Sequence, residues 1–279
     1  MFKKAMIKKD NEIIPQYIRD QLPEGDAFAH IMALQGEVFR DMPGRLTINF
    51  KLGEQSYFVK QHFGVGWKEI FKNLLSLKMP IIGARTEKLA IERLNAIGIP
   101  TTPLVAFGER GCNPATQQSF VITQDLGDIT SLETLCADWK NNPPPPRFKR
   151  RLIVAVAKIA QNLHDNGMNH RDFYICHFCL DNVALKHDEI KLYLIDLHRV
   201  GIAQRISVNA RMKDLAGLYF SAMDIGLTKR DYLRFLSVYR KQPLHKTLNN
   251  ESGFWHQVSV RADELYKKFQ RKYAVRDVN

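Results

Sequence analysis

The chain has 279 residues, 45% of them hydrophobic and 25% charged, which is the composition of an ordinary globular protein with one large or two modest domains. Lys and Arg outnumber Asp and Glu by 41 to 29, so the surface should attract nucleotide phosphates, lipid headgroups, nucleic acid or an acidic protein, unless it is basic without a specific anionic partner. The four cysteines are too few for a disulfide framework. No apolar run approaches the ~20 residues of a membrane span, and the basic start lacks the apolar core of a signal peptide. We therefore expect a cytosolic protein.

The first 124 residues have the pattern of a small lobe rich in strands. The stretch 31–62 is strand-like, and a turn at Gly53 divides it into a hairpin. The predicted elements are strands at 47–50 and 56–60, helices at 67–77 and 87–97, and strands at 104–108 and 119–123. Gly98 and Pro100 follow the second helix as an ordinary stop signal. Strands and helices in this order predict an α+β lobe.

After Gln124 the pattern becomes helical. The predicted elements are helices at 131–139, 147–164, 213–223, 229–239 and 255–273, with one strand at 191–195. The prolines at 143–146 form either a partner-binding polyproline segment or a stiff connector. We therefore divide the chain into an N-terminal lobe, residues 1–124, and a C-terminal lobe, residues 125–279.

The segment with the most chemical information is Asn169-His170-Arg171-Asp172, which precedes an apolar strand that ends at Asp196. Protein kinases carry H-R-D-x-x-x-x-N and then D-F-G, in which the first Asp receives the proton of the acceptor hydroxyl. His170, Arg171 and Asp172 are therefore the candidate catalytic residues, with Asp172 as the base. The alternative for Asp172 is a capping residue in a polar turn. The pattern predicts a bilobal, protein-kinase-like α+β fold, with a strand-rich N-lobe that binds the nucleotide and a helical C-lobe that carries catalysis and acceptor binding.

Two residues are candidates for a magnesium site. Asp196 is expected to be the main ligand, because magnesium prefers carboxylate oxygens. His177 stands where kinases have the metal-binding Asn. An imidazole nitrogen suits magnesium less well than an amide oxygen, so His177 should position phosphate or substrate, or bind the metal only weakly.

The nucleotide-binding candidates lie in the N-lobe. Lys60 ends the strand-like Tyr-Phe-Val-Lys, as does the kinase lysine that contacts the α- and β-phosphates. Glu87 on the following helix is expected to orient the Lys60 ammonium, and Glu92 is its rival on a different face of that helix. A lysine at the exposed edge of a sheet is the alternative for Lys60.

The stretch where kinases have a nucleotide lid, 35–45, lacks G-x-G-x-x-G. Its candidates for nucleotide contact are Gly36 and Arg40, with Arg45 as a second basic residue. Arg40 and Arg45 could replace backbone amides as phosphate donors, or they could be solvated loop charges.

Two further features have structural alternatives. Asp214 begins a predicted helix, and in kinase folds an Asp there braces the catalytic loop; otherwise it is a helix-start charge. Cys176 and Cys179 form a C-x-x-C pair that suggests zinc together with nearby histidines, but a structural zinc site needs a second close pair, which Cys112 and Cys136 do not provide. Buried, inert thiols are therefore expected.

Taken together, the motifs resemble the lipopolysaccharide core heptose(I) kinase family (WaaP/RfaP) of Gram-negative bacteria. The stretches that carry the resemblance are 34–40, 56–60, 71–77, 137–139, 169–178, 195–199, 213–215 and 218–221. Within them, the run His170 to His177 is highly specific, and a His in the Asn position is a trait of this family. Cys179 departs from the apolar residue expected there.

The resemblance implies ATP-dependent phosphorylation of the first heptose of the lipopolysaccharide inner core. Asp172 would be the catalytic base, and Lys60 and Glu87 the nucleotide-side pair, with ATP and magnesium as cofactors. The expected partners are the lipopolysaccharide core acceptor and the anionic surface of the inner membrane, with an acidic carrier protein as a further candidate and no nucleic acid. The expected location is cytoplasmic, peripheral to the inner membrane.

Two other functions fit some of the same residues. A kinase acting on a protein or a small molecule would share Lys60, Asp172 and Asp196, although no A-P-E follows Asp196 before Asp214, as a protein kinase would require. A kinase-like module that binds an anionic glycolipid or an acidic carrier protein without catalysis would have little reason to keep all three residues.

Overall fold

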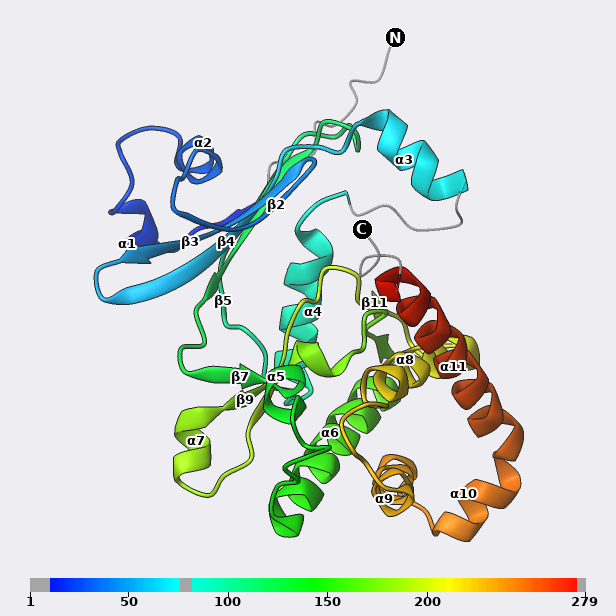
Figure 1. Ribbon diagram of the computed structural model, residues 1–279. Coiled ribbons are helices and arrows are strands. Elements are labelled where there is room, and N and C mark those ends of the chain that lie inside the picture. The colour runs from blue at the N-terminus through cyan, green and yellow to red at the C-terminus, as the bar shows by residue number, and fades with distance from the viewer. Residues whose placement is uncertain (1–10, 76–81, 275–279) are drawn as a thin grey trace. The chain divides into compact units, whose positions relative to one another are not determined.

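The computed structural model describes residues 11–75 and 82–274 (Figure 1). It consists of two compact units: one contains the residues up to Glu92 together with Thr102–Leu126, and the other contains Arg93–Thr101 and the chain from Gly127 onward. The first unit is built on a sheet, and the second is mainly helical. The predicted α+β class, with a strand-rich N-terminal part and a helix-rich C-terminal part, is confirmed.

The first unit contains a six-stranded sheet in which every neighbouring pair is antiparallel. The strand order is β1-β5-β6-β4-β3-β2. The strands are β1 (Asn11–Ile13), β2 (Glu37–Met42), β3 (Arg45–Leu52), β4 (Gln55–His62), β5 (Leu104–Arg110) and β6 (Gln118–Gln124). The helices are α1 (Gln16–Arg19), α2 (Ala27–Met32), α3 (Gly66–Leu75) and the part of α4 (Arg85–Ala96) up to Glu92, since its last turn is assigned to the second unit.

The hairpin predicted from alternation is β3–β4, and its turn contains Gly53 in the left-handed region with φ 58°. Ile48 and Val59 are paired in its register and are both buried. They pack in one apolar core with Phe28 and Ile31 of α2. The alternating pattern therefore identified the side of the hairpin that faces the core.

The strand-like pattern was wrong at its start, because Ile31 lies in α2 rather than in a strand. The side chain of Asp26 accepts hydrogen bonds from the first amides of this helix and so fixes its beginning. The stretch where a lid loop was expected is largely strand β2, whose residues are all exposed. An exposed edge strand buries neither face, so it shows no apolar alternation in the sequence.

The two helices predicted after the hairpin are both present. α4 covers Arg85–Ala96 and ends before Gly98, which has φ 72°. α3 is described to Leu75, and the two further residues predicted for it lie outside the described part of the chain.

In the second unit, the helices are α5 (Leu132–Cys136), α6 (Pro146–Asp165), α7 (Asn182–Lys186), α8 (Val208–Ser221), α9 (Lys229–Arg240), α10 (Leu244–Asn250) and α11 (Ser252–Ala274), with a 3₁₀ turn η1 (Ile175–His177). The strands are β7 (Ile129–Ser131), β8 (Met168–Asn169), β9 (Phe178–Asp181), β10 (Leu192–Leu194) and β11 (Gly201–Ile202). They form a three-stranded sheet, β10-β9-β7, and a separate pair, β11-β8. The shortest of these elements were not predicted.

The long helices have identifiable starts. Ser131 caps α5 as predicted, but α5 ends at Cys136 instead of continuing to Trp139. α6 has Pro146 as its first residue, where a missing amide hydrogen costs nothing, so the proline run leads directly into this helix. α8 begins at Val208, five residues before its predicted start, because Ser207 caps it.

An apolar cavity of about 310 Å³ lies inside the second unit. Its walls come from α5, α6, α8, α9 and α11, and include Leu132, Val156, Leu215, Ala222, Phe235 and Val258. Cavities of this size lined by apolar groups favour apolar ligands over water.

None of the helices among residues 11–75 and 82–274 has the length and apolarity needed to cross a membrane.

Candidate active site

Two short strand pairings place the residues of the H-R-D segment and the Asp196 segment side by side. β8 pairs with β11, so that Asn169 lies opposite Gly201. β9 pairs with β10, so that Phe178 lies opposite Leu194. His177 precedes Phe178, and the carbonyl of His177 accepts a hydrogen bond from the amide of Ile195 at 3.0 Å. Asp172, His177 and Asp196 are thereby brought together within the second unit.

Asp214 holds the backbone of the catalytic loop. Its carboxylate accepts from the amide of His170 at 2.6 Å and from the amide of Arg171 at 2.9 Å, and the side chain is buried. A third contact joins it to the ring of His164 at 3.3 Å. Arg171 has φ 69°, an unfavourable conformation for a non-glycine residue. The bonds to Asp214 offset this strain, so the brace expected at Asp214 is present.

His170 connects the loop to the strand that carries Asp196. Its Nε2 lies 2.9 Å from the carbonyl oxygen of Ile195, which can only accept, so Nε2 carries the hydrogen. The side chain is fully buried, and burial lowers the pKa of His170. Burial therefore favours the neutral ring, and its hydrogen bond ties the loop to the Ile195 carbonyl.

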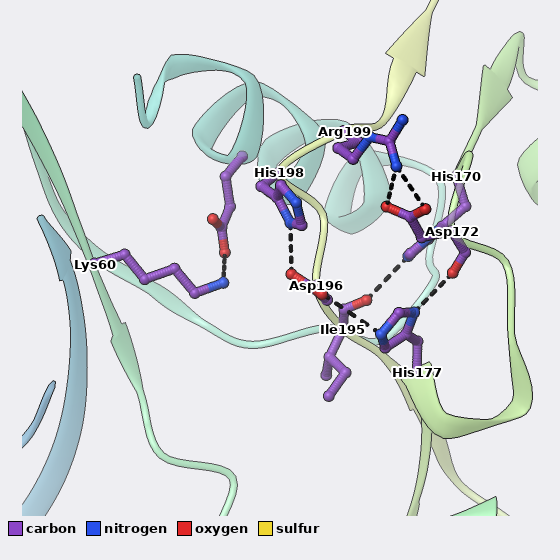
Figure 2. A network of polar contacts seen from close by, with 9 residues as sticks. Lys60, His170, Asp172, His177, Ile195, Asp196, His198 and Arg199 are labelled. Atoms are coloured by element: carbon purple, nitrogen blue, oxygen red, sulfur yellow. Dashed lines mark hydrogen bonds and ion pairs between the residues drawn. The ribbon is translucent and has the colours of Figure 1, made fainter. Parts of the chain in front are cut away.

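Asp196 lies between two imidazole rings (Figure 2). Its Oδ1 is 2.6 Å from Nδ1 of His198, and its Oδ2 is 3.4 Å from Nε2 of His177. The Nδ1 of His177 is 2.7 Å from the backbone carbonyl of Asp172 and donates to it. In the neutral ring, Nε2 of His177 therefore presents a lone pair toward Asp196. Asp196 itself has φ 62°, so the backbone is strained at this position too.

The sequence did not reveal the ion pair between Arg199 and Asp172. The Nη1 of Arg199 is 2.8 Å from Oδ1 and 3.1 Å from Oδ2 of the carboxylate (Figure 2). The Arg199 side chain is 38% exposed and that of Asp172 18%. Nη1 donates both hydrogen bonds, so the N–H groups on the other guanidinium nitrogens are not used in this ion pair. The only signal in the sequence was a basic residue three positions after Asp196.

The nucleotide-side candidates form a pair inside the first unit. The Nζ of Lys60, on β4, is 2.6 Å from Oε1 of Glu87, on α4. Glu87 is buried, whereas its rival Glu92 pairs with Lys88 at 2.8 Å. The ion pair favoured by the sequence is therefore the one that forms.

Gly36 and Arg40 lie on the β2 side of the β2–β3 hairpin. A side chain at Gly36 would collide with the carbonyl of Asn49 on β3, so this glycine allows close approach of two backbones. Arg40 is exposed on β2, beside an irregularity in the register that begins at Val38. The hairpin thus explains Gly36 structurally, and a nucleotide contact by either residue stays a prediction.

The cysteines of the C-x-x-C pair are free thiols. Burial raises the pKa of Cys176 and of Cys179 to about 11, so both are protonated at neutral pH. In the part of the chain that the structure describes, no three His, Cys, Asp or Glu side chains converge as metal ligands.

The pair formed by Asp196 and His177 fits magnesium better than zinc. Magnesium is commonly held by one or two protein carboxylates, with phosphate and water oxygens completing its shell. A structural zinc site would require four protein ligands. The Asp196 carboxylate beside the braced Asp172 loop, in a two-unit α+β fold, is the arrangement expected of a protein of the kinase class.

Comparison with known proteins places the chain within this class. The sequence pattern of the Lipopolysaccharide kinase (Kdo/WaaP) family matches residues 29–239. The chain belongs to this family.

The relatives are similar over nearly their whole length. The chain is 47% identical to the lipopolysaccharide core heptose(I) kinase WaaP of Pseudomonas aeruginosa, over 88% of this chain and 92% of the relative. It is 49% identical to the WaaP of Escherichia coli K12, over 88% of this chain and 94% of the relative. A solved structure, WaaP in complex with acyl carrier protein, is 40% identical with a TM-score of 0.79 and covers 92% of this chain and 99% of that one.

Proposed function

We propose that the protein transfers the γ-phosphoryl group of ATP to a hydroxyl of the first heptose of the lipopolysaccharide inner core. The observation that carries the proposal is the Asp172 loop, braced by Asp214 and joined to Asp196, in a chain of the lipopolysaccharide kinase family. Relatives at 47% and 49% identity are named as heptose(I) kinases. These similarities support the same acceptor for this chain.

In the proposed reaction, Asp172 accepts the proton of the heptose hydroxyl as the oxygen attacks the γ-phosphorus. Phosphoryl transfer needs positioning and charge stabilisation more than covalent help from the protein. His170 and Arg171 act indirectly, because they fix the loop that carries Asp172. Arg199 keeps the Asp172 carboxylate oriented and offers its remaining donors to the transferring phosphoryl group, as a cationic side chain does in many such enzymes.

Lys60, kept in place by Glu87, is the proposed contact to the α- and β-phosphates, and Gly36 and Arg40 of the β2–β3 hairpin are the proposed lid. Asp196 is the proposed magnesium ligand, with Nε2 of His177 as a weaker second one. Bound magnesium would neutralise charge on the phosphate oxygens. The position of His177 supports this role, since its Nε2 lies 3.4 Å from Oδ2 of Asp196.

The acceptor is amphiphilic and carries anionic groups, so a basic chain is suited to meet it at a membrane surface. We propose that the protein is cytoplasmic and associates peripherally with the inner membrane through charge. The excess of 12 basic residues supports this, because each Lys or Arg near an anionic bilayer contributes ~1 kcal/mol.

An acidic carrier protein is the second proposed partner. A homologous structure is described as WaaP in complex with acyl carrier protein. The apolar cavity of the second unit supports a specific form of this interaction, because a cavity of about 310 Å³ with apolar walls suits a fatty acyl chain. We propose that an acylated carrier protein places its acyl chain in this cavity.

The test of the main proposal is a transfer assay with labelled ATP. Purified protein should phosphorylate lipopolysaccharide core that contains unphosphorylated heptose, and should leave casein and free sugars unlabelled. Core lacking heptose is the matched acceptor control. Equal labelling of casein would assign the protein to a broader kinase activity, and binding of core without labelling would point to a non-catalytic module.

A further inference from the structure

Helix α3 presents a stripe of large apolar side chains to solvent. Trp67, Phe71 and Leu75 are 50%, 57% and 86% exposed. They are four residues apart and therefore lie along one face of the helix. The rings of Trp67 and Phe71 stack with their centroids 5.8 Å apart. Ile70, on the neighbouring face, is buried, so one side of α3 is anchored while the next side exposes apolar groups.

Two more large apolar residues are exposed at the end of the sheet where β2 and β4 both end, and α3 follows β4 there (Figure 1). Met42 and Phe63 are 39% and 42% exposed. The amide of Phe63 donates to the carbonyl of Gly44 at 2.9 Å, which ties the β2–β3 turn to the end of β4. We call the exposed stripe of Trp67, Phe71 and Leu75 the α3 patch. Contiguous apolar surface of this kind marks an interaction site.

Basic side chains border the stripe. Lys68 and Lys72 each follow a residue of the stripe, so they lie about 100° further around the helix, and both are exposed. Glu69 is the only acidic residue of α3, and its carboxylate pairs with Lys72 at 3.1 Å. Both lysines lie on the side of the stripe opposite the buried Ile70. Lysines beside an apolar face are typical of helices that lie in the plane of a membrane interface. The first residue of the stripe is Trp67, and tryptophan is enriched at membrane–water interfaces.

We propose that the α3 patch is the surface through which the protein inserts into an anionic lipid bilayer. The inference rests on the membrane association proposed above and adds the element that enters the bilayer. Lys68 and Lys72 contact lipid phosphates, while Trp67, Phe71 and Leu75 enter the boundary between headgroups and acyl chains. A fluid bilayer accepts a convex helix face without a complementary groove, whereas the centre of a protein interface is depleted of lysine.

The fluorescence of Trp67 provides a direct test. The chain has three tryptophans, and Trp139 is only 7% exposed while Trp67 is 50% exposed. Vesicles of phosphatidylglycerol and phosphatidylethanolamine with brominated acyl chains should quench the emission of the bound protein. Trp67→Phe should bind these vesicles somewhat more weakly, and, compared at a lipid concentration that binds both proteins fully, it should lose most of the quenching. Equal quenching of the wild type and Trp67→Phe would overturn the inference.

Sedimentation with the same vesicles tests the energetic contribution of the patch. The triple change Trp67→Ser, Phe71→Ser and Leu75→Ser should lower the partition coefficient about 10- to 100-fold, since burial of even one large apolar side chain is worth about that factor. Val260→Ser is the matched control, because Val260 is 43% exposed but lies on α11 of the second unit. The control should partition like the wild type.

The remaining outcomes separate this inference from the proposals on which it rests. If the wild type binds the vesicles and the triple variant binds equally, membrane association stands and the α3 patch is not its site. If the wild type does not bind anionic vesicles in low salt, the membrane association itself is wrong. If the triple variant keeps its vesicle binding but loses acyl carrier protein, the patch is a protein interface and the inference is overturned.

Discussion

Asp172 is held from two sides. Its backbone belongs to a loop fixed by Asp214, and its carboxylate is paired with Arg199. The first set of contacts places the residue, and the second orients the two oxygens that would receive the acceptor's proton in the proposed reaction. Because removal of a positioned base typically costs ~10²–10⁴-fold in rate, Asp172→Ala should reduce phosphotransfer by at least that factor. The measurement is the rate of labelled phosphate transfer, with circular dichroism to verify folding. A folded Asp172→Ala that retains more than about a tenth of the activity would falsify the assignment.

Arg199 should affect the rate of transfer more than the binding of ATP. Loss of one donor to a developing negative charge costs ~10²–10³-fold in kcat, so Arg199→Ala should lower kcat by about that factor and change the KM for ATP little. Added guanidinium should restore part of the activity of Arg199→Ala, which a merely structural defect would not allow. Arg151→Ala is the matched control, because Arg151 pairs with Asp188 in the same unit and its side chain is 32% exposed. Loss of activity without any rescue would argue against the proposed role.

Asp196 and His177 should differ in their contributions to metal binding. Asp196→Asn should weaken magnesium-dependent ATP binding strongly, because it removes the only charged oxygen ligand proposed for the metal. His177→Asn should retain altered but measurable activity, because it restores the residue that most kinases have at this position. The check is a titration of ATP with and without magnesium for both variants. If Asp196→Asn keeps the full magnesium effect, the metal is held elsewhere.

At the scale of single residues, the sequence predicted best where a motif has a fixed spacing. The positions of Asp172, His177 and Asp196 followed from such spacing, and Glu87 followed from its helical face. Arg199 and His198 were missed, because their contacts depend on the backbone at Asp196, which is left-handed with φ 62°. No local pattern encodes the direction in which such a turn points its side chains.

At the scale of elements, the sequence predicted the helices and strands that bury one face better than those that are exposed or very short. β3, β4, α4 and α6 bury one face, so their apolar periodicity identified them. β2 is wholly exposed, and β8, η1 and β11 contain two or three residues each. Elements this short form because the residues on either side are already fixed, so their own sequence carries little signal. These elements nevertheless position the active site, since β8–β11 and β9–β10 bring its two segments together.

His170, whose hydrogen bond to the Ile195 carbonyl connects the catalytic loop to the end of β10, should make the free energy of unfolding depend on pH. Burial keeps the pKa of His170 below its ordinary value of 6.5. Well above pH 6.5 the ring is neutral in both the folded and the unfolded chain. As the pH falls below 6.5, the unfolded chain takes up a proton that the folded chain does not, so the free energy of unfolding decreases.

Urea unfolding at pH 8 and pH 5.5 measures this effect. The variant His170→Gln should be less stable than the wild type at pH 8, because it disturbs the bond to the Ile195 carbonyl. It should also lose less stability on acidification, because one titrating group is gone. An equal loss in both proteins would show that His170 does not contribute to the pH dependence.

At the scale of the whole molecule, the charge and the apolar surfaces have separate roles. The net charge of +12 attracts any anionic surface over about a screening length, which is about 8 Å at physiological salt and about 3 Å at 1 M. In the proposed interactions, charge would bring the protein to a membrane or an acidic partner without selecting between them. Apolar surface would then make the selection, through the α3 patch in the first unit and the cavity in the second.

The cavity should distinguish an acylated carrier protein from an unacylated one. Each methylene group that leaves water stabilises the complex by ~0.8 kcal/mol, so a long acyl chain should tighten binding well beyond tenfold. Ala222→Phe fills the cavity from its wall and should abolish this gain while leaving the binding of unacylated carrier protein unchanged. Val183→Phe adds the same bulk at an exposed position on α7 and is the control. Calorimetric titration of both carrier forms measures the difference. If Ala222→Phe binds the acylated form as tightly as the wild type does, the acyl chain lies outside the cavity, and contact with the carrier is confined to the protein surface.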